Sequence, residues 1–109
     1  MIIKICGIKT LEEALYATEA GADMLGFNFY PLSIRYIELD ACTQITTTLR
    51  NMGKSVVLVG VFVNEKPNRV QEILRICGLE MAQLSGDESP GDLKFLGDEA
   101  FKAVRPKSL

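Results

Sequence analysis

The stretch that decides the fold is Ile2-Ile3-Lys4-Ile5-Cys6-Gly7-Ile8-Lys9-Thr10. A short apolar run ends at a cysteine and a glycine, and a threonine then precedes a helical pattern. This order predicts a buried strand that leads directly into a capped helix. In proteins that alternate strands and helices, the reactive side chains stand at the carboxyl ends of the strands. Cys6 therefore lies where such a protein carries a catalytic residue.

The same alternation continues along the chain. Further strands are predicted over residues 24–29, 55–63, 80–84 and 101–104, and helices over residues 11–20, 39–52, 67–77 and 92–96. Strands that alternate with helices form a parallel sheet with right-handed crossovers. A doubly wound sheet and a (β/α) barrel both fit this order. No GxGxxG or GxxxxGK[ST] loop follows any strand, which argues against the doubly wound nucleotide-binding sheet.

Composition excludes several classes of protein. The 109 residues are 48% hydrophobic and 24% charged, which is typical of one small globular domain and not of a disordered chain. The formal charge of −2 and the scattered Lys and Arg residues argue against a nucleic-acid or membrane-surface binder. The apolar runs are about as long as a strand, and a membrane helix needs roughly 20 residues.

The chain contains three cysteines and no histidine. The cysteines are Cys6, Cys42 and Cys77, and no two of them form a CxxC pair. This set offers too few ligands for a zinc site, so no metal is expected. Free thiols in the reducing cytoplasm are the simplest explanation. Cys77 continues the apolar stripe of a predicted helix, and we therefore assign it to the core.

The loop Tyr30-Pro31-Leu32-Ser33-Ile34-Arg35-Tyr36 follows the second predicted strand, so it lies on the same rim as Cys6. The planar fork of Arg35 suits a carboxylate or a phosphate, although a solvated loop charge has the same signature. Gly26, inside the preceding strand, predicts the close approach of another backbone or of a ligand. Cys6 itself also fits a second interpretation, as a small buried hydrophobic residue.

Five motifs, in order, resemble the phosphoribosylanthranilate isomerase family. They are Lys4-Ile5-Cys6-Gly7-Ile8-Lys9-Thr10, Gly21-Ala22-Asp23 with Leu25-Gly26-Phe27-Asn28-Phe29-Tyr30-Pro31, Ser33-Ile34-Arg35-Tyr36, Val59-Gly60-Val61-Phe62-Val63-Asn64 and Gln83-Leu84-Ser85-Gly86-Asp87-Glu88. Each motif alone is weak evidence for the family. The five occur in the family's order, however, and together they span nearly all of the chain.

The resemblance implies a TIM barrel and an Amadori rearrangement of N-(5-phosphoribosyl)anthranilate in tryptophan biosynthesis, without a metal or organic cofactor. By position, Cys6 matches the general base that removes the proton from ribose C2. Arg35 matches the residue that holds the anthranilate carboxylate, and Gln83 lies in a motif that contacts the substrate. The family's general acid is an aspartate after the sixth strand, which protonates the ribose ring oxygen.

The chain departs from this pattern in two respects. Ser85 stands where the family usually has a histidine. A complete barrel has eight strands and about 200 residues or more, but five strands are predicted here. The strand that carries the acid and the later phosphate-binding loops fall outside the chain, and Asp87 and Asp92 do not match the acid by position.

We therefore expect residues 1–109 to form a single half-barrel domain, the N-terminal part of a (β/α)8 barrel. Open strand edges and an apolar inner face favour pairing with a second copy or with a complementary C-terminal half. The expected function is the isomerase reaction, with little turnover by this chain alone. The alternative is a catalytically dead half barrel that acts as a binding or assembly module. Another phosphate-sugar barrel of the same pathway is a third possibility, which the loop around Arg35 argues against.

Overall fold

Strands and helices alternate throughout residues 1–103, the part of the chain that the computed structural model describes. The strands are β1 (Lys4–Cys6), β2 (Met24–Asn28), β3 (Val57–Phe62), β4 (Met81–Leu84) and β5 (Ala100–Lys102). The helices are α1 (Leu11–Glu19), α2 (Leu39–Asn51), α3 (Pro67–Cys77) and α4 (Pro90–Leu96), and a 3-10 turn, η1 (Gly97–Glu99), precedes β5.

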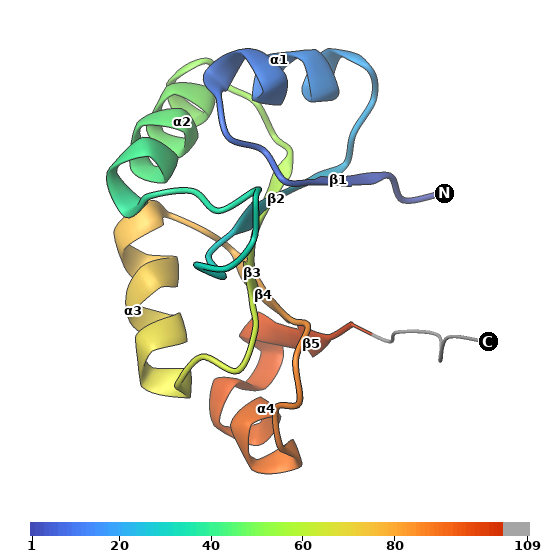
Figure 1. Ribbon diagram of the computed structural model, residues 1–109. Coiled ribbons are helices and arrows are strands. Elements are labelled where there is room, and N and C mark those ends of the chain that lie inside the picture. The colour runs from blue at the N-terminus through green and yellow to red at the C-terminus, as the bar shows by residue number, and fades with distance from the viewer. Residues whose placement is uncertain (104–109) are drawn as a thin grey trace, which may run out of the picture.

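The strands form one sheet in the order β1-β2-β3-β4-β5, and every neighbouring pair is parallel. The helices lie along one side of this sheet and follow its curve from α1 to α4 (Figure 1). A doubly wound sheet would reverse its strand order and carry helices on both faces. The predicted class, a partial barrel of five parallel strands and four α-helices, is therefore confirmed for the described residues.

The hydrophobic core lies between the sheet and the helices. Leu25, Phe27, Leu58 and Phe62 are at most 1% exposed, and they pack with the inward stripes of the helices. These strands are hydrophobic because the helices remove their outward-facing side chains from water, as in other parallel sheets. Cys77 belongs to this core at 1% exposure, as predicted.

Several elements differ from their predicted bounds, and α4 and β3 each begin two residues away from the predicted start. Helix α4 begins at Pro90 and not at residue 92, because the Ser89 side chain accepts a hydrogen bond from the Asp92 N–H and proline is well suited to the first helical position. Strand β3 begins two residues later than predicted. Just before β3 begins, the Val56 carbonyl oxygen accepts a hydrogen bond from Arg50 Nη1 at 3.0 Å. This carbonyl group is therefore bonded to a side chain and not, among the described residues, to a neighbouring strand.

The inner face of the sheet is strongly curved. Lys4 Nζ lies 5.2 Å from the centroid of the Phe101 ring, although Lys4 is on β1 and Phe101 is on β5, at opposite edges of the sheet. Within residues 1–103, β1 and β5 each pair with one neighbour only. The described part of the chain is thus an arc of a barrel, and the strand at either end has one unpaired edge.

Candidate functional site

Cys6 is the last residue of β1 and is exposed, which excludes the interpretation of Cys6 as a buried hydrophobic residue. The prediction of a buried strand is also wrong, because β1 lies at the edge of the described sheet and Ile5 is 40% exposed. Cys6 stands opposite Gly26 of β2 in the parallel register. A Cβ atom on Gly26 would lie 2.9 Å from Cys6 Sγ, which is closer than real Cβ atoms pack, and 3.3 Å from Cys6 Cα, which is a tight contact. Gly26 therefore makes room for Cys6, and the predicted close approach of another backbone at Gly26 is confirmed.

Gly7 turns the chain away from β1 immediately after Cys6. Its φ of +83° is in the left-handed region that glycine adopts readily. The N–H groups of Gly7 and Ile8 both donate to the carbonyl oxygen of Gly26, at 3.0 and 3.1 Å. Because those bonds hold the turn against β2, the carbonyl group of Gly7 has a fixed position next to Cys6.

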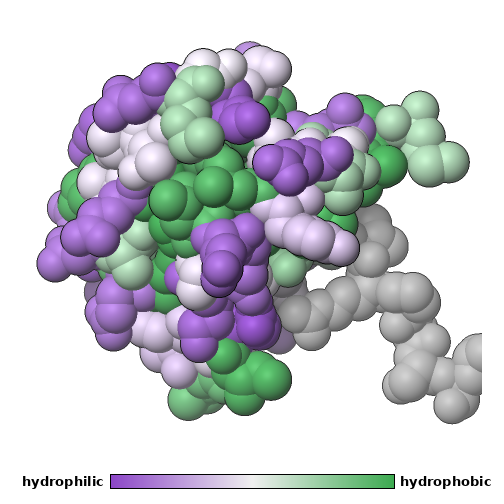
Figure 2. All heavy atoms as spheres, turned by 90° about the horizontal axis from the view of Figure 1, so that it is seen from above, coloured by the Kyte–Doolittle hydropathy of each residue, from purple (hydrophilic) through white to green (hydrophobic). Residues whose placement is uncertain are grey.

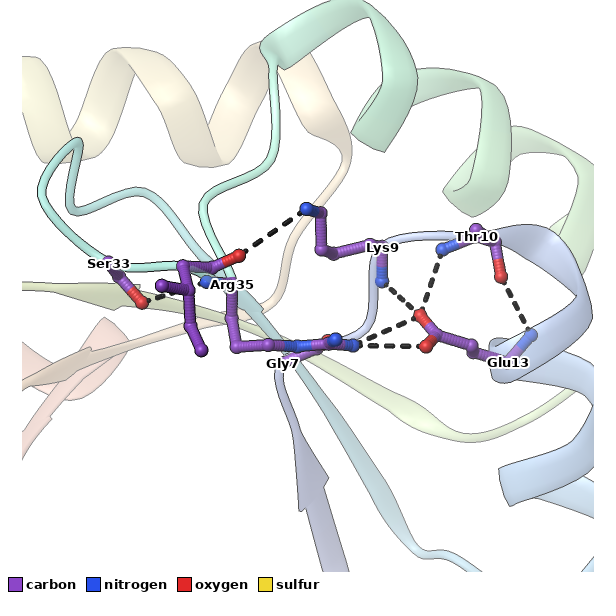
Figure 3. A network of polar contacts seen from close by, with 7 residues as sticks. Gly7, Lys9, Thr10, Glu13, Ser33 and Arg35 are labelled. Atoms are coloured by element: carbon purple, nitrogen blue, oxygen red, sulfur yellow. Dashed lines mark hydrogen bonds and ion pairs between the residues drawn. The ribbon is translucent and has the colours of Figure 1, made fainter.

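Arg35 binds this turn from the loop that follows β2. Its Nε donates to the Gly7 carbonyl oxygen at 2.8 Å, and its Nη2 donates to the same oxygen. Nη2 also donates to Glu13 Oε2 at 3.0 Å and to Glu13 Oε1 at 3.2 Å (Figure 3). The Lys9 backbone N–H and then the Arg35 guanidinium lower the pKa of Glu13 below its ordinary value of 4.5.

The loop that carries Arg35 is fixed near its ends. Asn28 Oδ1 accepts a hydrogen bond from the Tyr30 N–H at 2.8 Å, and Ser33 Oγ accepts one from the Arg35 N–H at 3.1 Å. Lys9 Nζ donates to the Ile34 carbonyl oxygen at 3.4 Å (Figure 3). These bonds hold the backbone of Arg35 over the start of α1.

Cys6, Gly7 and Arg35 line one groove of about 630 Å³. Glu12 and Glu13 also line it, and the rest of its wall is apolar. The apolar residues lie in or next to β1 and α1, among them Ile3, Ile5, Tyr16, Ala17 and Ala20. Ile3 and Ile5 are 41% and 40% exposed, and Tyr16 is 78% exposed. Seen from above, the molecule shows hydrophobic side chains bordered by hydrophilic ones (Figure 2). The structure therefore brings Cys6 and Arg35 together beside an apolar surface.

Gln83 does not line that groove. It lies on β4 between Val61 of β3 and Phe101 of β5, one inward-facing row beyond Cys6 in the register. Its Nε2 donates to Ser85 Oγ at 3.0 Å, and its Oε1 is buried without a hydrogen-bond partner among residues 1–103. Gln83 is thus near the carboxyl ends of the strands but separate from the Cys6 and Arg35 pair.

A buried ion pair at the same rim was not predicted. The Glu88 side chain is 1% exposed and accepts from Lys102 Nζ at 2.9 Å, Asn64 N–H at 2.7 Å and Gly86 N–H at 2.9 Å. Burial favours a higher pKa for Glu88, but hydrogen bonds from Lys102 and from backbone N–H groups outweigh it, so the pKa is lowered. The sequence indicates this ion pair only by an acidic residue after one predicted strand and a lysine within the next.

The described part of the chain has neither a cluster of metal-binding side chains nor a membrane-spanning helix. Its Cys, Asp and Glu side chains form no group of three or more that could hold a metal ion. None of its helices has the length and hydrophobicity that a bilayer crossing requires.

Residues 3–107 match the family model of N-(5'phosphoribosyl)anthranilate (PRA) isomerase. The chain belongs to this family. An N-(5'-phosphoribosyl)anthranilate isomerase from Solibacter usitatus is 52% identical over 92 residues, which are 84% of this chain and 43% of that protein. The family resemblance inferred from the five sequence motifs is thereby confirmed.

Solved structures of PRA isomerases have the same fold. The enzyme from Thermus thermophilus superposes with a TM-score of 0.90 at 38% identity, over 98% of this chain and 53% of that one. A monomeric form generated from the dimeric Thermotoga maritima enzyme superposes with a TM-score of 0.85 at 39% identity, over 95% of this chain and 53% of that one. This chain thus spans about half the length of the PRA isomerases that it matches.

Proposed function

We propose that this chain provides the base and the carboxylate anchor of a PRA isomerase site, for the Amadori rearrangement of N-(5'-phosphoribosyl)anthranilate in tryptophan biosynthesis. The observation that carries the proposal is the shared position of Cys6 and Arg35. Both line one groove that runs along β1, and Arg35 is bonded to the residue that follows Cys6 at the carboxyl end of that strand. Family membership supports the same assignment.

Each side chain has chemistry that the reaction requires. After the ribose ring opens to a protonated imine, the Cys6 thiolate takes the proton from C2, and the C2–H electron pair forms the C1=C2 double bond of an enolamine. The imine nitrogen receives the displaced π pair and becomes an amine. The enolamine then tautomerises to the ketose product. Arg35 holds the anthranilate carboxylate, for which its planar fork is well suited.

Gln83 completes the proposed set of substrate-contacting residues. Its amide and the Ser85 hydroxyl form a polar pair on the inner face of β4, where a sugar hydroxyl group has hydrogen-bond partners. Ring opening needs a general acid, which the family resemblance places on a later strand. Residues 1–109 act in this proposal as one half-barrel domain of a cytoplasmic enzyme.

A completing partner is the second part of the proposal. Strands β1 and β5 each have one unpaired edge within residues 1–103, and the apolar groove lies along β1. Unpaired edges and exposed apolar surface favour association. The partner is either a complementary C-terminal half or a second copy of this chain, and we expect little turnover by the chain alone.

The test is an isomerase assay on the 109-residue chain, with and without the C-terminal half of the Thermus thermophilus enzyme. We expect turnover when the halves are combined, and its loss in Cys6→Ala. Turnover that Cys6→Ala leaves unchanged would overturn the role of Cys6. Association without any turnover would instead favour the alternative, a binding or assembly module. Size-exclusion chromatography with light scattering reports association, and a stable monomer at micromolar concentration in every mixture would contradict the need for a partner.

A further inference from the structure

The contact between Glu13 and Arg35 bears on how the carboxylate anchor is oriented. Both carboxylate oxygens of Glu13 accept from Arg35 Nη2, at 3.0 and 3.2 Å. The two side chains are 41% and 44% exposed, so neither is held by burial. The direction of the guanidinium group therefore depends on its hydrogen-bond partners, Glu13 and the Gly7 carbonyl group.

Glu13 is itself fixed by the start of α1. Its Oε1 accepts from the Lys9 N–H at 2.7 Å and from the Thr10 N–H at 3.2 Å, while Thr10 Oγ1 accepts from the Glu13 N–H at 3.0 Å. This reciprocal pair is a capping box. The helix start thus places the Glu13 carboxylate independently of Arg35, and Figure 3 shows this carboxylate between the capped turn and the guanidinium group.

The bonds to Gly7 and Glu13 also determine where the remaining nitrogen of the Arg35 guanidinium group points. The Gly7 carbonyl group and Glu13 engage Nε and Nη2, whereas Nη1 has no acceptor among residues 1–103. A guanidinium group is planar, so fixing two of its nitrogens fixes the third. Nη1 is then the nitrogen available to a ligand.

We propose that Glu13 is a positioning residue, which holds Arg35 so that its Nη1 edge is presented to the carboxylate of an aromatic acid in the groove. The inference rests on the proposed function, in which Arg35 binds the anthranilate carboxylate. It differs from two simpler roles for Glu13. A residue that only caps α1 would not affect the ligand's carboxylate selectively, and a residue that only competes with the ligand for Arg35 would weaken binding.

Two variants separate these roles. Glu13→Gln keeps an oxygen that can accept from the Lys9 and Thr10 N–H groups but removes the charge that pairs with Arg35. Thr10→Ala is the matched control, because it removes the capping hydroxyl and leaves the Glu13 carboxylate in place. Circular dichroism and thermal melting confirm that both variants fold.

The first readout is the exchange with water of the Arg35 Nη2–H protons, which Glu13 accepts, measured by NMR on the full chain without ligand. We expect slow exchange in the wild type and in Thr10→Ala, and exchange several-fold faster in Glu13→Gln. Equal exchange in all three proteins would show that Glu13 does not hold Arg35, which overturns the proposal.

The second readout is the affinity for anthranilate, with anthranilamide as the probe that lacks a carboxylate. We expect Glu13→Gln to raise the Kd for anthranilate about threefold, the scale of a partly exposed ion pair, without changing the Kd for anthranilamide. Tighter anthranilate binding by Glu13→Gln, or equal weakening by Thr10→Ala, would overturn the proposal. If the wild type binds anthranilate and anthranilamide with equal Kd, Arg35 is not a carboxylate anchor, and the ligand part of the inference fails. The exchange measurement then reports separately whether Glu13 holds the guanidinium group.

Discussion

Arg35 Nε lies 2.8 Å from the carbonyl oxygen of Gly7, and this hydrogen bond joins the loop after β2 to the residue that follows Cys6. The two residues are 28 positions apart in the sequence. Glycine suits this position because its φ is positive and because a Cβ there would crowd Arg35 Nε at 3.0 Å. The candidate base and the candidate anchor are therefore parts of one local structure.

Arg35→Lys tests the anchor. Lysine keeps the charge but lacks the planar fork, so it cannot hold both the Gly7 carbonyl group and Glu13 in the same way. We expect anthranilate affinity to fall about tenfold, the loss of one charge-assisted hydrogen bond, while thermal stability changes little at this half-exposed site. Arg69→Lys is the control, because Arg69 pairs with Glu72 on the surface of α3. An unchanged affinity in Arg35→Lys would remove Arg35 from the site.

Gly26→Ala tests the packing that makes room for Cys6. The added methyl group would lie 2.9 Å from Cys6 Sγ and 3.3 Å from its Cα, and the Cα belongs to a backbone that cannot move freely. We expect the free energy of unfolding to fall by about 1–3 kcal/mol, measured by urea denaturation. Gly91→Ala in α4 is the matched control, because its added methyl group would meet only Ser89 Oγ at 3.6 Å. Equal stability in the two variants would contradict this account of Gly26.

Glu88→Gln tests the buried ion pair at the rim. The carboxylate accepts from Lys102 and from two backbone N–H groups, so its removal should lower the free energy of unfolding by roughly 2–3 kcal/mol at neutral pH. Because its pKa is lowered on folding, this stability is present above the ordinary value of 4.5 and is lost as the pH falls through the folded pKa.

The measurement is the urea midpoint between pH 7 and pH 3. The wild type should lose its advantage over Glu88→Gln as the pH falls below about 4.5, the ordinary pKa of a glutamate. Glu72→Gln, on the surface of α3, controls for the loss of one negative charge. A difference between wild type and Glu88→Gln that stays constant with pH would show that the charge of Glu88 does not contribute.

Thiol reactivity separates the three cysteines. Cys6 is exposed, whereas Cys42 and Cys77 are at most 1% exposed. We expect Ellman's reagent to modify one thiol per chain rapidly in the native state and the other two only in denaturant. Cys6→Ser should abolish the rapid phase. A rapid phase that survives in Cys6→Ser would show that the core around α2 and α3 opens readily.

The sequence was sufficient to predict the strand and helix order, because each helix carries its own hydrophobic stripe and each strand its own apolar run. The positions of Cys6 and Arg35 followed from the rule that strand ends share one rim. Lys4 could not be oriented, since the curvature that brings it to Phe101 depends on all five strands. The contact of Glu13 with Arg35 could not be predicted for a related reason, because a helix cap alone also favours an acidic residue at this position of α1.

The most direct test of the account measures kcat and KM separately for the chain combined with the C-terminal half of the Thermus thermophilus enzyme. If Cys6 is the base and Arg35 the anchor, Cys6→Ala should lower kcat by a factor of about 10² or more with KM nearly unchanged, the scale of general base catalysis. Arg35→Lys should mainly raise KM. An unchanged kcat in Cys6→Ala would contradict the central claim that Cys6 removes the proton from the substrate.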